Sequence, residues 1–152
     1  MGYEFSDDAL LTLALTHRSF CAENEDAESN ERLEFLGDAV VGLAVTGFIH
    51  DAYPDLPEGQ LAKLRASVVN TTTLADVAQH IGLGRDLRLG RGEEMSGGRT
   101  KESILADAFE AVIGAVYVDS DWDRANAVVL DCLGEQIAQG AQRPGRLDYK
   151  TR

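Results

Sequence analysis

The amino-acid sequence has 152 residues, of which 26 are acidic and 14 basic, and it carries a formal net charge of −12. A chain of this length fits one domain whose core needs no disulfides. We find no apolar run close to the ~20 residues of a membrane span and no pattern of a secretory signal at its start. Cys21 and Cys132 form no CxxC pair, which favours free thiols in a reducing, cytoplasmic compartment. The charge argues against a simple basic nucleic-acid binder.

The negative charge is concentrated in the first part of the chain. Residues 1–60 hold 13 acidic and 2 basic side chains, whereas residues 61–152 hold 13 and 12. A solvated acidic surface that aids solubility is the simplest explanation of such an excess. The alternative is that some of these carboxylates share a cation.

Apolar residues three and four positions apart recur along most of the chain, which is the pattern of amphipathic helices. Pro54 would end the long helix that begins at Glu31, because proline lacks the amide donor. We predict helices over residues 6–16, 31–53, 55–69, 71–80, 101–118 and 122–138. Residues 19–30 predict a polar loop, and residues 82–99 a basic, glycine-rich loop. No strand-like alternation persists, so the predicted fold class is all-α.

Two groups of carboxylates fall on single helix faces. Glu31, Glu34 and Asp38 are three and four residues apart, and Asp107 and Glu110 are three apart on another helix. Like charges at this spacing destabilise a helix slightly, so carboxylates gathered on two facing helices would need a cation. Oxygen ligands favour a hard ion such as Mg²⁺. The spacing by itself also suits two solvated helix faces.

Gly37 lies between two of these carboxylates. Glycine in an exposed helix interior costs about 1 kcal/mol relative to alanine. This cost usually marks a close approach by another helix or by substrate. Each carboxylate group also borders an apolar stripe, which places it at the edge of the predicted core.

Residues 30–38, with the sequence NERLEFLGD, resemble the signature of the ribonuclease III family, the endonucleases that cleave double-stranded RNA. Further segments that resemble the same family are residues 15–19, 58–70, 90–98 and 102–111. The resemblance covers about residues 6–139. It implies an all-helical endonuclease domain that forms a homodimer.

The resemblance also implies a metal site. It places the ligands at Glu34, Asp38, Asp107 and Glu110, with Asp38 and Glu110 as catalytic residues. The implied cofactor is one or two Mg²⁺ ions per subunit, for which Mn²⁺ can substitute. The expected reaction is metal-assisted hydrolysis of phosphodiester bonds in double-stranded RNA. The expected products carry 5′ phosphates, 3′ hydroxyls and short 3′ overhangs, and ribosomal RNA precursors are among the expected substrates.

Other positions receive roles from the same resemblance. Glu31 and Glu58 would lie near the RNA or support the site, and Phe35 would fill a cavity in the partner subunit. RNA duplexes are recognised by A-form shape, phosphates and 2′-hydroxyls, which gives basic side chains a part in phosphate contact. The candidates for such contacts are Lys63, Arg65, Arg85, Arg88, Arg91, Arg99 and Lys101.

The resemblance predicts a domain boundary near the end of the chain. Residues 1–139 are the expected endonuclease domain. Residues 140–152 are an expected linker toward a double-stranded RNA-binding domain that this chain lacks, since residues 148–151 resemble the start of that connection.

Three alternatives remain open at this point. A catalytically silent RNA-binding module could share the fold, and an all-α nucleotide pyrophosphohydrolase also uses acidic helix pairs with Mg²⁺. The adjacent His50 and Asp51 would be metal ligands in a phosphohydrolase of the His-Asp type. We expect His17 to be structural, because it can fix the loop before the helix that begins at Glu31.

Overall fold

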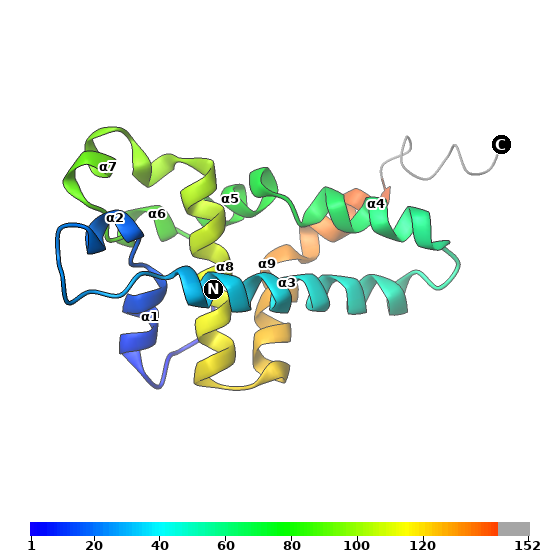
Figure 1. The fold of residues 1–152 in the computed structure, drawn as a ribbon. Helices are drawn as coiled ribbons and strands as arrows, with labels where there is room; N and C mark the ends of the chain where they lie inside the picture. The colour runs from blue at the N-terminus through cyan, green and yellow to red at the C-terminus, as the bar shows by residue number, and fades with distance from the viewer. Residues whose placement is uncertain (143–152) are drawn as a thin grey trace.

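The computed structural model describes residues 1–142, and every regular element in that range is helical. The all-α prediction is therefore confirmed. Figure 1 shows the elements, whose bounds are α1 Asp8–Ala14, α2 Arg18–Cys21, α3 Glu31–Ala52, α4 Glu58–Val68, α5 Thr71–His80, α6 Leu83–Asp86, α7 Arg91–Met95, η1 Gly98–Thr100, α8 Glu102–Asp119 and α9 Trp122–Gln142.

The centre of the fold is the crossing of α3 and α8 (Figure 1). Almost all of α8 from Ile104 to Val116 is buried, which fits a helix that is apolar on every side. A β-carbon on Gly37 would lie 1.6 Å from the carbonyl oxygen of Glu110, and one on Gly114 would lie 2.3 Å from the carbonyl oxygen of Leu33. The close helix approach predicted at Gly37 is confirmed, and it sets the position of the carboxylates around it.

The last helix is longer than predicted. It continues past residue 138 to Gln142, and both Gly140 and Ala141 are buried. A β-carbon on Gly140 would lie 2.9 Å from side-chain atoms of Leu64 and of Ser67, so α9 packs tightly on α4 here. The rest of the expected linker, residues 143–152, lies outside the described residues, and the domain boundary stays a prediction.

Two stretches that we expected to be loops contain short helices. Helix α2 begins at Arg18 and extends into the segment 19–30. The segment 82–99 contains α6, α7 and part of η1. Arg99 explains the order of the second stretch, because its guanidinium donates to the carbonyls of Gly84, Arg85 and Leu87. Tertiary hydrogen bonds of this kind leave no periodic signal in the sequence.

One helix differs from the expectation about membrane segments. By length and composition, α3 is apolar enough to cross a membrane, although the sequence had suggested no such segment. The core helix of a compact domain passes the same test. Here α3 carries three carboxylates in its first two turns, and one side of it packs against α8.

Candidate metal centre

The crossing of α3 and α8 gathers three carboxylates. Glu34 lies in the first turn of α3, and Asp107 and Glu110 lie one turn apart on α8. One ligand oxygen from each of the three lies within 4.8 Å of the others. Glu110 is only 9% exposed, and the other two are half-buried. Among the carboxylate, histidine and cysteine side chains of residues 1–142, these three form the group that could hold a metal ion.

Asp38 borders this cluster. It lies on α3 one turn after Glu34, is exposed, and lies close enough to Glu110 to raise the pKa of that carboxyl. The structure thus brings three of the four predicted ligands together and places the fourth beside them.

The cluster holds protons more tightly than isolated carboxyls do. Burial raises the pKa of Glu110 to about 8, and the hydrogen bond and negative charge of Asp38 act in the same direction. Burial and the neighbouring Asp107 raise the pKa of Glu34 to about 7, and burial raises that of Asp107. Such shifts mean that nearby cations among residues 1–142 do not fully balance the negative charge of the ionised cluster. An all-oxygen donor set in this state fits a hard divalent cation.

A cavity of about 750 Å³ opens beside the cluster. Its walls come from α2, α3, α7 and α8 and from the residues that precede α2, α3 and α8. Glu31, Glu34 and Asp107 line it on one side, and the cationic Arg18 and Lys101 line it too. Arg18 was not among the site residues predicted from the sequence. Its place within residues 15–19, one of the segments that resemble the family, was the available signal.

His17 lines the same cavity. Burial lowers its pKa, although the nearby Glu93, Asp107 and Glu31 oppose this effect. Its backbone N–H donates to the carbonyl of Arg88 at 3.0 Å, which ties the start of α2 to the segment after α6. The expected structural role of His17 therefore agrees with these contacts.

The two supporting carboxylates lie at different places. Glu31 lines the cavity, and its carboxylate accepts a hydrogen bond of 2.8 Å from the Ser29 hydroxyl. Glu58 begins α4, beyond the far end of α3. The 18 helical steps from Glu34 to Ala52 alone span about 27 Å at 1.5 Å per residue. Within one chain the structure does not bring Glu58 to the cluster.

The basic candidates differ in how much of each side chain is already engaged. Arg99 gives its donors to three carbonyls and to an ion pair with Glu94, so we no longer propose it for phosphate contact. Lys101 Nζ lies 2.6 Å from the carboxylate of Glu93 at the edge of the cavity. Arg65 donates to the Thr46 hydroxyl at 3.3 Å.

Arg88 has a second structural role. Its guanidinium lies 4.3 Å from the centre of the Phe20 ring and donates to the Thr16 hydroxyl at 3.1 Å. Arg91 is exposed at the start of α7, where its backbone N–H donates to Glu23. Arg91 is therefore better placed than Arg88 to contact another molecule.

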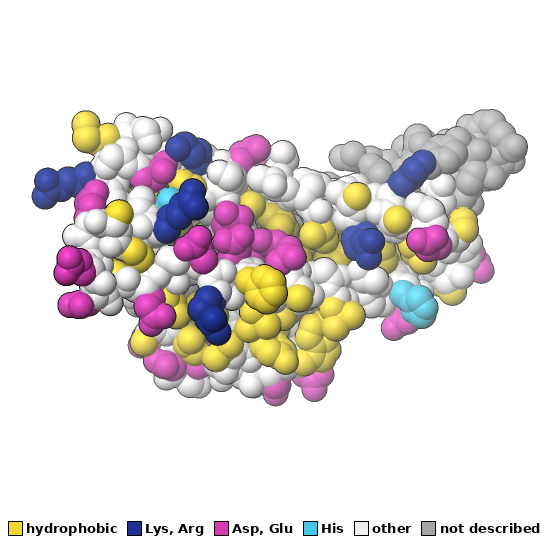
Figure 2. Space-filling model, viewed as in Figure 1, with side chains coloured by type: hydrophobic (Ala, Val, Ile, Leu, Met, Phe, Trp, Pro, Cys, Tyr) yellow, Lys and Arg dark blue, Asp and Glu magenta, His cyan; other side chains and the backbone are white. Residues whose placement is uncertain are grey.

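Phe35 belongs to an exposed apolar surface on α3. Its side chain is 83% exposed, and Leu43, two turns later, is exposed as well. Figure 2 shows hydrophobic side chains gathered beside acidic ones on the face that α3 presents. A cavity of about 600 Å³ lies further along the helix, lined by residues that include Leu43, Gly47, Phe48 and Trp122.

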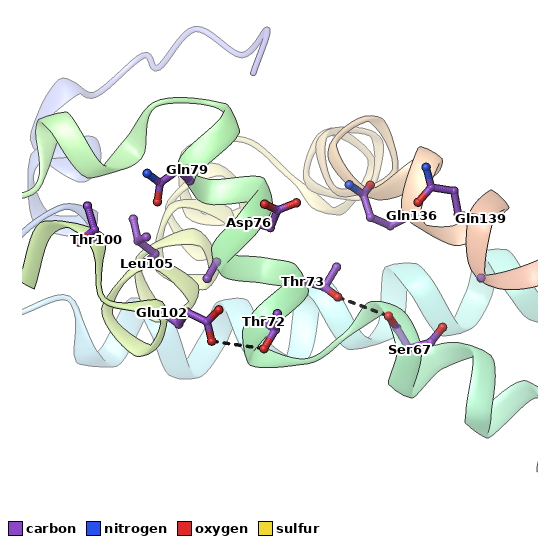
Figure 3. Close-up of a pocket in the computed structure, with 12 residues that line it drawn as sticks. Ser67, Thr72, Thr73, Asp76, Gln79, Thr100, Glu102, Leu105, Gln136 and Gln139 are labelled. Atoms are coloured by element: carbon purple, nitrogen blue, oxygen red, sulfur yellow. Dashed lines mark hydrogen bonds between the residues drawn. The ribbon is translucent and has the colours of Figure 1, made fainter. Parts of the chain in front are cut away.

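Another cavity, of about 410 Å³, lies away from the cluster between α5, α8 and α9 (Figure 3). Polar side chains line it, and the Thr72 hydroxyl donates to Glu102 at 3.3 Å across one wall. None of the site residues predicted from the sequence lines this cavity. It is therefore not part of the candidate metal centre.

The His-Asp alternative finds no support in the structure. His50 Nδ1 lies 2.9 Å from the carboxylate of Asp51, and both side chains are exposed near the end of α3. In the described part of the chain no further metal-ligating group joins them.

Comparison with known proteins decides the family. The family described as Ribonuclease-III-like matches residues 7–137. The chain belongs to the ribonuclease III family. It is 55% identical over 151 residues to "Ribonuclease 3" of Thermobifida fusca and 54% identical to "Ribonuclease 3" of Streptomyces coelicolor. A solved nuclease domain of ribonuclease III from Campylobacter jejuni is 41% identical, with a TM-score of 0.82 over 88% of this chain and 91% of that one.

The curated relatives are longer proteins. The chain is matched over 99% of its length, yet it spans 62% of the Thermobifida fusca protein and 54% of the Streptomyces coelicolor protein. The solved Campylobacter jejuni nuclease domain has nearly the same extent as this chain.

Proposed function

We propose that this chain is the nuclease part of a Mg²⁺-dependent endoribonuclease that hydrolyses phosphodiester bonds in double-stranded RNA. The observation that carries the proposal is the group Glu34, Asp107 and Glu110, whose oxygens lie within 4.8 Å beside an open cavity. Names of the relatives support the choice of RNA as substrate. The proposed products carry 5′ phosphates, 3′ hydroxyls and short 3′ overhangs, and the proposed substrates include ribosomal RNA precursors.

Glu34, Asp38, Asp107 and Glu110 would hold one or two Mg²⁺ ions per subunit, or Mn²⁺ in their place. Bound Mg²⁺ supplies a water of lowered pKa and positive charge for the phosphate. Asp38 and Glu110 are the proposed catalytic pair on the strength of the family resemblance; Asp38 is exposed and Glu110 is buried. The Glu110 side chain is buried, and its backbone carbonyl packs against α3 at Gly37.

We further propose a homodimer through the exposed face of α3. Gly42 and Gly47 lie in the interior of this helix, and a β-carbon on either would meet nothing within 4 Å. Each glycine destabilises the helix by about 1 kcal/mol relative to alanine. No close packing among residues 1–142 explains why glycine is needed at either position. Close approach of a second subunit supplies such a reason.

A two-fold dimer would place Phe35 in a specific position. In a two-fold interface the same surface of each subunit meets its copy. We propose a two-fold axis perpendicular to α3, which makes the two α3 helices antiparallel. A crossing near Val41 would bring Phe35 of one subunit opposite Gly47 of the other. The cavity of about 600 Å³ that Leu43, Gly47 and Trp122 line would then receive the phenyl ring.

The proposed RNA contacts are made by basic side chains, and Arg99 is left out because its donors are engaged within the domain. Lys63, Arg65, Arg91 and Lys101 remain the candidates for phosphate contact. We propose a cytoplasmic protein whose nuclease domain ends with α9, a few residues later than the boundary at 139 expected from the sequence. The residues after α9 would connect it to a double-stranded RNA-binding domain, which agrees with the greater length of the relatives.

The experiment that tests this function compares three substrates. An RNA duplex, one of its single strands and a nucleoside triphosphate are each incubated with the chain, with Mg²⁺ and with EDTA. We expect the duplex to be cut only with Mg²⁺ and the other two to stay intact. Binding of the duplex without cleavage would favour a silent module, and release of pyrophosphate would favour a pyrophosphohydrolase; either outcome contradicts the proposal.

A further inference from the structure

The ring of His17 is held in one orientation at the wall of the cavity beside the carboxylate cluster. His17 precedes α2, and its Nδ1 accepts a hydrogen bond of 3.1 Å from the backbone N–H of Ser19. The hydroxyl of Ser19 lies 2.8 Å from the same nitrogen. Two contacts on one side of the imidazole therefore fix its plane.

The backbone N–H of Ser19 determines which nitrogen carries the proton. A backbone N–H can only donate, so its hydrogen bond of 3.1 Å makes His17 Nδ1 an acceptor. The proton of the neutral ring is therefore on Nε2. His17 thus presents an uncharged N–H donor on the side of the ring away from α2. The Ser19 hydroxyl, which lies 2.8 Å from Nδ1, accepts a hydrogen bond of 2.8 Å from the backbone N–H of Gly90.

Gly90 is needed for this arrangement. A β-carbon at this position would lie 2.4 Å from the carbonyl oxygen of Ser19. The glycine-rich segment therefore contributes to the site by allowing its backbone to approach Ser19. A series of contacts thus links Gly90 to Ser19 and Ser19 to the ring of His17. Capping a four-residue helix alone would not require the contact with Gly90.

No hydrogen bond of Nε2 is found among residues 1–142, although His17 lines the cavity together with Glu34 and Asp107. A phosphate that enters this cavity meets several carboxylates and therefore needs donors. Arg18 and Lys101 line the cavity as cations, and Lys101 is also paired with Glu93. A neutral N–H donor serves a phosphate oxygen without the cost of burying a further charge.

We propose that Nε2–H of His17 donates a hydrogen bond to a non-bridging oxygen of the RNA backbone phosphate that occupies this cavity. His17 would then contact substrate directly, in addition to the carboxylates, and the inference rests on the proposed function. It assigns His17 a binding role beyond the structural one that its Nδ1 performs.

Two substitutions separate the roles of the two ring nitrogens. In His17→Asn the side-chain oxygen can replace Nδ1 as acceptor for the Ser19 N–H, but the donor at the place of Nε2 is lost. In His17→Gln the amide nitrogen reaches the place of Nε2, but the acceptor at Nδ1 is lost. A purely structural histidine would tolerate Asn better than Gln.

The measurements are the melting temperature, and KM and kcat for a duplex RNA with Mg²⁺. We expect His17→Asn to melt within a few degrees of the wild type and to raise KM about tenfold, as for loss of one hydrogen bond to a charged group. His17→Gln should keep a KM closer to that of the wild type despite a lower melting temperature. Wild-type KM and kcat in a folded His17→Asn chain would overturn the inference while the proposed function stands.

Further outcomes are decisive as well. If the wild-type chain leaves duplex RNA intact in Mg²⁺, the proposed function fails and this inference fails with it. If His17→Asn does not fold, the ¹⁵N-histidine NMR spectrum of the wild-type chain at pH 8 takes its place. A proton on Nε2 whose resonance shifts on adding duplex RNA with Ca²⁺ supports the inference, and a proton on Nδ1 contradicts it.

Discussion

The carbonyl oxygen of Glu110 lies 1.6 Å from where a β-carbon of Gly37 would stand, so α3 and α8 meet there backbone to backbone. Glu34 and Asp38 flank Gly37 on one helix, and Asp107 precedes Glu110 by one turn on the other. The separation of the carboxylates is therefore fixed by a glycine contact rather than by the carboxylates themselves.

Replacing Gly37 should separate the helices. We expect Gly37→Ala to lower the free energy of unfolding by about 3 kcal/mol, at the upper end of the usual cost of overpacking, because the obstacle is backbone. Urea denaturation measures this. Gly134→Ala is the matched control, since a β-carbon on that exposed α9 residue meets nothing within 4 Å. It should be neutral or stabilising by up to ~1 kcal/mol. Equal effects of the two changes would contradict the explanation.

The raised pKa values predict that metal binding releases protons. Glu110, with a pKa of about 8 against an ordinary 4.5, keeps its proton in the folded state at pH values where the unfolded chain has lost it. Stability of the metal-free protein should therefore fall as the pH rises from about 4.5 to 8 and level off above that. Because Mg²⁺ needs the ionised carboxylates, its affinity should rise from pH 6 to pH 8.5.

Titration calorimetry with Mg²⁺ in two buffers of different ionisation enthalpy measures the released protons. Glu110→Gln, which cannot ionise at this position, should release fewer. An Mg²⁺ affinity that is the same at pH 6 and pH 8.5, with no proton release, would be incompatible with the described cluster.

The exposed face of α3 predicts an effect of Phe35 on assembly. Phe35→Ala should shift the chain toward monomer at low micromolar concentration, because it removes the ring that is proposed to fill the cavity near Gly47. Sedimentation velocity gives the mass. Met95→Ala, which removes a side chain that is 88% exposed on α7, should leave the mass unchanged. A Phe35→Ala chain that stays dimeric would count against this interface.

Arg99 should matter for folding more than for RNA. Arg99→Lys loses the donors to the carbonyls of Gly84, Arg85 and Leu87. We expect a loss of about 1–3 kcal/mol in the free energy of unfolding, measured in urea. Arg91→Lys, at an exposed position, should leave stability within about 0.5 kcal/mol. An Arg99→Lys chain as stable as the wild type would refute the structural role of this guanidinium.

The parts of the fold that could be predicted from the sequence are those with a long periodic pattern. The start of α3 at Glu31 and the course of α8 follow from apolar residues at three- and four-residue spacing. The carboxylates could be found for the same reason, since helical spacing puts Asp107 and Glu110 on one face. Gly37 pointed to the helix crossing because its cost had no local explanation.

Other features depend on contacts between distant residues and left no pattern in the sequence. The short helices α2, α6 and α7 are held by partners such as Arg99 and Gly90 rather than by an apolar stripe. The role of Arg99 could not be read from a basic, glycine-rich segment, whose composition suggested RNA contact instead. The place of Glu58, a helix length away from the cluster, is likewise a property of topology alone.

The measurement that tests the central claim most directly is cleavage of a labelled RNA duplex in Mg²⁺ by the wild-type chain and by Glu110→Gln. The amide keeps the size of the side chain and removes its charge, so the variant should stay folded and fail to cut. Asp131→Asn, at an exposed position on α9, is the control and should cut normally. Near-normal cleavage by a folded Glu110→Gln chain would contradict the assignment of this cluster as the metal centre.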